Sequence, residues 1–161
     1  MRRAVEWALA WRGEAGYATR CLAFVEDAYE RANGIEMFGG DYAAESADLM
    51  HARLNPGRPP RGAFVFYDFV GTMLGEHRNW GHVALAVGGG RVVHAWDVVR
   101  VDGHLAVEDL ATGPGWTRPS YIGWVPVTRL FEGARPKEWG TDGSAAAEAL
   151  AAQERRFGAG R

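Results

Sequence analysis

The sequence has one cysteine, Cys21, in 161 residues, and no excess of either charge: 18 Lys and Arg residues stand against 20 Asp and Glu. A single thiol excludes an internal disulfide bond and a cysteine-pair metal site. The net charge of −2 gives no basic footprint for nucleic acid or for an anionic membrane surface. Binding to polyanions is therefore not expected.

Long hydrophobic runs are also missing. The longest apolar stretch, residues 63–74, is interrupted by Asp68 and is shorter than the roughly 18 to 20 residues of a membrane span. Glu6 and Arg12 interrupt the N-terminal segment before it reaches the length of a signal-peptide core. We expect no membrane partner and no signal peptide, hence a cytoplasmic protein or one exported by a non-classical or phage route. The 47% hydrophobic content suffices for one domain.

Three segments predict helices: residues 4–12, 20–33 and 41–50. Apolar residues recur at helical spacing in the first two, and Gly13 and Gly34 follow as stop signals. Thr19 is the expected N-cap of the second helix, which places Cys21 in its first turn.

Strand-forming residues dominate after the proline-rich segment 55–60. Five segments are expected to be strands: residues 63–67, 82–87, 91–96, 98–101 and 121–127. Helices followed by strands predict an α+β domain over residues 1–132, with N-terminal helices packed on a central antiparallel sheet. Residues 133–161 are polar and rich in glycine and alanine, and we expect a weakly helical or disordered tail.

Glycines 88–90 predict a hairpin between the second and third strands. With a three-residue loop, Val87 faces Arg91, and His82 and His94 become diagonal neighbours on one face. Two imidazoles in this position can share a hydrogen bond. A two-residue turn would place them on opposite faces, so the register decides whether the two histidines can interact.

Cys21 allows two interpretations. The N–H groups and dipole of a helix N-terminus would lower the pKa of its thiol and make it a nucleophile; alternatively, it is a small buried apolar residue. The histidine face carries Ala84 and Ala86, whose small side chains leave room for a helix. If the Cys21 helix packs there, His82 can act as general base and His94 can orient it. The two histidines could equally be satisfied polar groups of a half-buried hairpin.

No metal or cofactor is expected. The histidines at 77, 82, 94 and 104 match no common ligand spacing, and no His-Glu-x-x-His motif is present. Trp80 and Trp96 flank the proposed site, where they could line a groove or belong to the core.

Together these segments resemble the NlpC-type papain-like cell-wall peptidases and, more loosely, the CHAP amidases. The resemblance covers residues 4–127 and is most specific in the hairpin, where a Gly-His-Val strand, a glycine turn and a second His-Ala follow one another. It implies a papain-like fold with Cys21 as nucleophile, His82 as base and His94 as third catalytic residue. It also implies a peptidoglycan-like substrate.

The sequence departs from the NlpC pattern around the cysteine. The family's Asp-Cys-Ser-Gly is replaced by Arg-Cys-Leu-Ala at residues 20–23, and Arg20 is expected to repel the usual ammonium group and to favour a carboxylate. Tyr17 is the candidate for the family's oxyanion-stabilising tyrosine, although it could instead pack the first helix on the second. The backbone N–H of Cys21 is the other expected donor. Asp97, the carboxylate nearest to His94 in sequence, falls on the opposite face.

We therefore predict a cysteine hydrolase that cleaves amide bonds, in a peptide or a peptidoglycan fragment, through an acyl-cysteine intermediate. Acyl transfer from the same intermediate and a non-catalytic binding module on the same fold are the alternatives. The protein is expected to act as a monomer.

Overall fold

A computed structural model describes residues 1–139; residues 140–161, with most of the predicted tail, lie outside the described residues. The helices are α1 (Arg2–Ala10), α2 (Cys21–Asn33), α3 (Ala43–Leu49) and α4 (Val127–Leu130), with 3-10 turns at Ala52–Leu54 and Ala106–Asp109. The main sheet contains β2 (Phe64–Asp68), β5 (His82–Gly88), β6 (Arg91–Ala95), β7 (Val99–Gly103) and β8 (Ser120–Val125). Its order is β7-β6-β5-β2-β8, with every neighbouring pair antiparallel. The predicted α+β class is confirmed.

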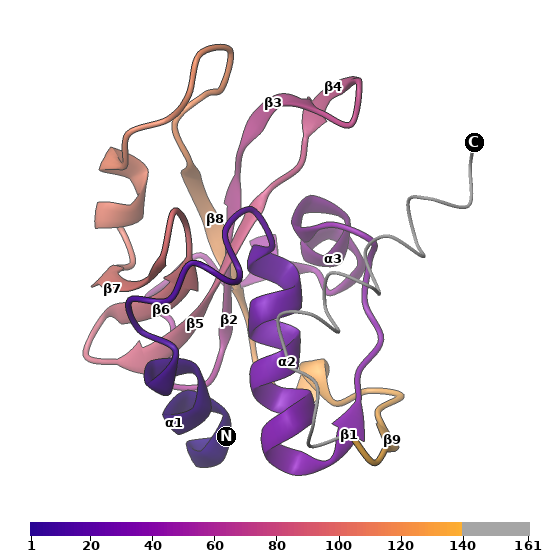
Figure 1. The fold of residues 1–161 in the computed structure, drawn as a ribbon. Helices are drawn as coiled ribbons and strands as arrows, with labels where there is room; N and C mark the ends of the chain where they lie inside the picture. The colour runs from indigo at the N-terminus through magenta and orange to yellow at the C-terminus, as the bar shows by residue number, and fades with distance from the viewer. Residues whose placement is uncertain (140–161) are drawn as a thin grey trace.

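Helix α2 lies across one face of this sheet (Figure 1). Phe24 and Val25 of α2 belong to the same core cluster as Val83 and Leu85 of β5. The alternate residues of β5, Ala84 and Ala86, pack in a second cluster on the opposite face. The expectation that α2 covers the alanine face is therefore wrong. The larger side chains of the other face offer more apolar area to bury, and burial of that area favours the observed packing.

The hairpin between β5 and β6 has the predicted register but a different turn. Leu85 faces Val93 and Ala86 faces Val92, as a three-residue loop requires, yet Gly88 pairs with Arg91 around a two-residue turn. A bulge between Ala86 and Gly88 adds one residue to β5 and restores the register. Glycines 88, 89 and 90 all have positive φ, which explains why this turn needs three of them.

Two small sheets were not predicted. A hairpin of β3 (Val70–Met73) and β4 (Glu76–Asn79) projects beyond the main sheet (Figure 1). The second sheet pairs β1 (Ile35–Glu36) with β9 (Arg135–Pro136).

The β9 strand lies in the segment expected to be tail. Nearby, Trp139 Nε1 donates to the Ile35 carbonyl at 2.8 Å. The Lys137 ammonium lies 4.0 Å from the Trp139 ring centroid. The domain boundary expected at residue 132 is therefore too early, and the docked chain extends at least to residue 139.

Helix α2 begins one residue later than expected. Arg20 is its N-cap and Cys21 its first residue. Thr19 does not cap the helix, because its backbone has φ +64° and lies in the left-handed region. Within residues 1–139, no helix has the length and apolar character needed to cross a membrane.

Candidate active site

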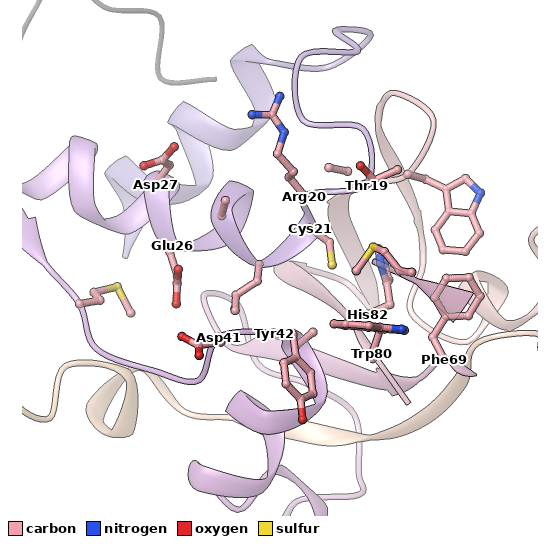
Figure 2. A pocket seen from close by; sticks show the side chains of 18 of the residues that line it. Thr19, Arg20, Cys21, Glu26, Asp27, Asp41, Tyr42, Phe69, Trp80 and His82 are labelled. Carbon is pink, nitrogen blue, oxygen red and sulfur yellow. The ribbon is translucent and has the colours of Figure 1, made fainter. Parts of the chain in front are cut away.

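A groove of about 980 Å³ opens at the N-terminal end of α2. Cys21, His82, Trp80, Trp96 and Arg20 are among the side chains that line it. Figure 2 shows the Cys21 sulfur pointing into this cavity on the side where His82 lies. Cys21 and His82 thus line the same groove, although α2 packs on the other face of β5.

Burial dominates the chemistry of the Cys21 thiol. It raises the thiol pKa to about 11, although the backbone N–H groups of Val83, Leu22 and Cys21 itself act in the opposite direction. The expected lowering of the pKa by the helix N-terminus is therefore wrong in direction, since desolvation outweighs the local amides. The resting form of Cys21 is the thiol, so a nucleophilic role requires a base close to the sulfur.

His82 and His94 form the predicted contact. Their side chains come from β5 and β6, and His82 Nε2 lies 2.8 Å from His94 Nδ1. His82 is 3% exposed and His94 is fully buried. Burial, and next the proximity of His94, lowers the pKa of His82 well below its ordinary value. His82 is therefore neutral near pH 7 and can accept a proton at Nδ1, the ring nitrogen that does not face His94.

Asp102 is a site residue that the sequence interpretation missed. Its Oδ2 lies 3.0 Å from His94 Nε2. It belongs to β7, where the register pairs His94 with Arg100 and Val92 with Asp102, so all four side chains share a face. Burial alone would raise the pKa of Asp102, but hydrogen bonds from Arg100 and His94 outweigh this effect and lower it. The alternation of Arg100 and Asp102 with valines was the available signal, but it required the β6–β7 register.

Asp97 does not take this position. Its Oδ1 accepts the Val98 N–H at 2.8 Å, in the exposed connection between β6 and β7. The carboxylate beside His94 therefore comes from the next strand and not from the nearest acidic residue in sequence.

The structure explains why the Gly-His-Val segment begins with a glycine, Gly81. It has φ +70°, and a Cβ at this position would lie 2.4 Å from the Ala44 backbone nitrogen. The neighbouring Trp80 carbonyl accepts the Ala44 N–H at 3.0 Å. Only glycine lets the start of α3 approach the residue before His82 this closely.

Gly81→Ala is expected to destabilise the fold by roughly 2–4 kcal/mol, because it adds a backbone clash to a left-handed conformation. Chemical denaturation measures this loss. Gly75→Ala is the matched control, since Gly75 also has positive φ but a Cβ there meets no atom within 4 Å. An equal loss in the two variants would show that the close approach to Ala44 contributes nothing.

The structure does not bring Tyr17 to the groove. Its side chain is fully buried, and its hydroxyl donates to Asp27 Oδ2 at 2.7 Å. Trp7 of α1, Trp11 directly after that helix and Phe24 of α2 surround the ring. Tyr17 packs the first helix on the second, which was the alternative interpretation, and it does not line the groove.

Arg20 lines the groove, but its head group turns away from Cys21 (Figure 2). The guanidinium donates to the Gly16 carbonyl and lies 5.7 Å from the Tyr17 ring centroid. Of the charged residues lining the groove, seven are acidic and three are basic. Arg20 alone therefore does not set the charge that a substrate meets.

Aromatic rings form one wall beside His82. The Trp96 ring centroid lies 5.1 Å from that of His82, nearly perpendicular to it. Phe69 follows at 5.2 Å from Trp96, and Trp116 at 4.5 Å from Phe69. Trp80 also lines the groove but is only 5% exposed, so it serves mainly as core. The half-buried row of Trp96, Phe69 and Trp116 offers apolar contact to a bound group.

Glu30 lies farther along α2 and also lines the groove. It is 8% exposed, and its Oε1 accepts the Met37 N–H at 2.8 Å. Burial raises the pKa of Glu30 to about 7, with a smaller contribution from Asp27 and an opposing one from the Met37 hydrogen bond. Native Glu30 is thus largely protonated at pH 6, where the unfolded chain would carry the carboxylate.

Stability contributed by the protonated Glu30 is complete below the ordinary glutamate pKa of 4.5 and is lost as pH rises through the native pKa of about 7. Glu30→Gln keeps the acceptor for Met37 and cannot ionise. Relative to the unmodified protein, we expect its free energy of unfolding to rise by about 1–3 kcal/mol between pH 4 and pH 8. Urea denaturation at both pH values measures this change. A difference between the two proteins that is independent of pH would contradict the assignment.

Within residues 1–139, no three or more His, Cys, Asp or Glu side chains are grouped as a metal site would require. Around Cys21, the groove offers a thiol, a neutral imidazole and the N–H groups at the start of α2.

Comparison with known proteins identifies the family. The model of the NlpC/P60 family matches residues 6–118. This chain belongs to the NlpC/P60 family. The resemblance to NlpC-type peptidases is thereby confirmed, and the family relates the chain to peptidoglycan hydrolases.

Among solved structures, the NlpC/P60 chain is similar to RipD from Mycobacterium tuberculosis, described as a non-catalytic NlpC/p60 domain protein with an adaptation to peptidoglycan-binding function. The two share 18% identity and superpose with a TM-score of 0.48, over 78% of this chain and 95% of RipD. None of the curated proteins compared with the chain matches it.

Proposed function

We propose that this NlpC/P60 protein is a cysteine hydrolase that cleaves an amide bond in a peptidoglycan-derived peptide. The observation that carries the proposal is the shared groove of Cys21 and His82, with His94 hydrogen-bonded to the far side of the His82 ring. A purely structural cysteine does not require a neutral imidazole in the same groove or an opening large enough for a peptide. Both features fit the general-base activation of a thiol.

The proposed reaction begins with attack of the Cys21 sulfur on the carbonyl carbon, while the thiol proton passes to His82 Nδ1. The oxyanion of the tetrahedral intermediate accepts a hydrogen bond from the Cys21 N–H at the start of α2. Collapse breaks the C–N bond, and His82 returns its proton to the departing amine, which leaves a thioester. Water then attacks the thioester, His82 takes and returns one proton, and the carboxylic acid product leaves the free thiol.

His82 must be neutral and unprotonated at Nδ1 for the first step. Its burial and its hydrogen bond through Nε2 both favour this state. The raised pKa of Cys21 means that proton transfer accompanies attack, rather than a thiolate being present at rest. The aromatic row of Trp96, Phe69 and Trp116 would contact apolar parts of the substrate.

Incubation of the full chain with soluble peptidoglycan fragments, single and cross-linked, followed by mass spectrometry, tests the proposal. We expect pairs of products whose masses add to that of the substrate plus one water. Products that incorporate an added amine instead of water would identify an acyltransferase. Fragments that bind without being cleaved would identify a binding module and overturn the proposed hydrolysis.

A further inference from the structure

Asp102 ends a chain of side chains that leads from the groove into the sheet. His82 contacts His94 at 2.8 Å, and His94 contacts Asp102 at 3.0 Å. Arg100 holds the carboxylate from the other side, with Nε 2.6 Å from Oδ2 and Nη2 3.2 Å from Oδ1. Three strands, β5, β6 and β7, thus contribute to one continuous row of hydrogen bonds.

We propose that Asp102 is a positioning residue that fixes the proton positions of both His94 and His82, so that His82 presents a bare Nδ1 to Cys21. The inference rests on the function proposed above and deepens it. Asp102 does not reach the groove and acts only through His94.

The direction of each hydrogen bond follows from the carboxylate. An ionised carboxylate can only accept, so the bond to Asp102 requires a proton on His94 Nε2. A neutral His94 then has a lone pair on Nδ1, which must accept from His82 Nε2. His82 carries its proton at Nε2 in turn, and its Nδ1 is left free. The Asp102 carboxylate therefore determines, through His94, which ring nitrogen of His82 carries the proton.

The surroundings of Asp102 indicate that it orients the His94 ring and has little effect on it through its charge. Arg100 on the same strand forms a two-point contact with the carboxylate and offsets its charge. From neighbouring elements, the charged and titratable groups that interact with the pair are His94 on β6, Asp97 in the turn after β6, and Tyr67 on β2. Because the Arg100–Asp102 pair is close to neutral, its main influence on His94 is the placement of a proton acceptor.

Nitrogen-15 NMR of histidine-labelled protein reads the ring protons directly and needs no substrate. We expect His82 and His94 both to carry their proton at Nε2 at pH 7 to 8. In Asp102→Asn, whose amide can donate as well as accept, we expect mixed tautomers at both rings. The rate of Cys21 alkylation by iodoacetamide at pH 7.5 should then fall by about 10–100-fold. Asp109→Asn, an exposed aspartate at the end of a 3-10 turn, is the matched control and should leave both readouts unchanged.

A proton at His94 Nδ1 in the unmodified protein would overturn the inference without any variant. A folded Asp102→Asn variant that keeps the proton at Nε2 of both histidines and keeps the alkylation rate would also overturn it. The predicted tautomers together with no cleavage of peptidoglycan fragments would count against the proposed hydrolase and leave the role of Asp102 standing. Cleavage of the fragments together with a proton at His94 Nδ1 would support the proposed hydrolase and overturn the role of Asp102.

Discussion

Cys21→Ala is expected to lower the rate of amide hydrolysis by at least about 10⁴-fold, because no acyl-enzyme can form without the sulfur. The fold should persist, since alanine is well tolerated in the first turn of a helix and the change removes a single heavy atom. Product formation from peptidoglycan fragments, measured by mass spectrometry, gives the rate. Circular dichroism and the unfolding midpoint establish that the variant is folded.

Cys21→Ser separates the nucleophile from the shape of the site. The hydroxyl occupies nearly the volume of the thiol but is a far weaker nucleophile without strong activation, so this variant should be almost as inactive as Cys21→Ala. Both variants should still bind fragments in the groove. Turnover by Cys21→Ala near that of the unmodified protein would place the nucleophile elsewhere and refute the proposed mechanism. Because the chain has no second cysteine, that nucleophile would not be a thiol.

The hairpin of β5 and β6 could be predicted from sequence because its determinants are local. Glycines 88–90 mark the turn, and the alternation of residues on each side then defines the shared face of His82 and His94. The exact turn was not predictable, since the bulge and the two-residue turn give the same register as a three-residue loop. Local patterns therefore fixed the relation between the two histidines without fixing the backbone path.

Residues that depend on packing between distant elements were predicted less well. Asp102 reaches His94 only through the pairing of β6 with β7, and the placement of α2 depends on which face of β5 has more area to bury. Tyr17 has a plausible spacing from Cys21, but the aromatic cluster between α1 and α2 removes it from the groove. Spacing along the chain did not reveal these competing contacts.

The segment after residue 132 shows the same limit. Its polar composition suggested a tail, yet β9 pairs with β1. Arg31 and Lys137 lie over the Trp139 ring at 4.7 and 4.0 Å. Cation–π contacts of this kind leave no periodic pattern in a sequence, so docking of residues 133–139 could not be read from apolar spacing.

His82→Ala is expected to slow Cys21 alkylation by iodoacetamide at pH 7 by at least about 10²-fold, the usual size of a general-base contribution. In the unmodified protein, neutral His82 can accept the thiol proton at every pH above its own lowered pKa. The rate should therefore change little between about pH 6 and pH 9. Without His82, only free thiolate reacts, and the thiolate fraction rises about tenfold per pH unit below the thiol pKa, which burial raises to about 11 in the intact site.

Alkylation reactions quenched at successive times, from pH 5 to pH 10, measure the pH–rate profiles of the unmodified protein and of His82→Ala. Labelling reports Cys21 alone because the sequence has no other cysteine. His77→Ala is the matched control, since His77 lies on β4 and its Nδ1 contacts the Thr72 hydroxyl outside the groove; it should reproduce the flat profile. Profiles of His82→Ala and the unmodified protein that coincide would show that the imidazole does not accept the thiol proton. Cys21 would then be an ordinary buried thiol, and the groove would be a binding site without this chemistry.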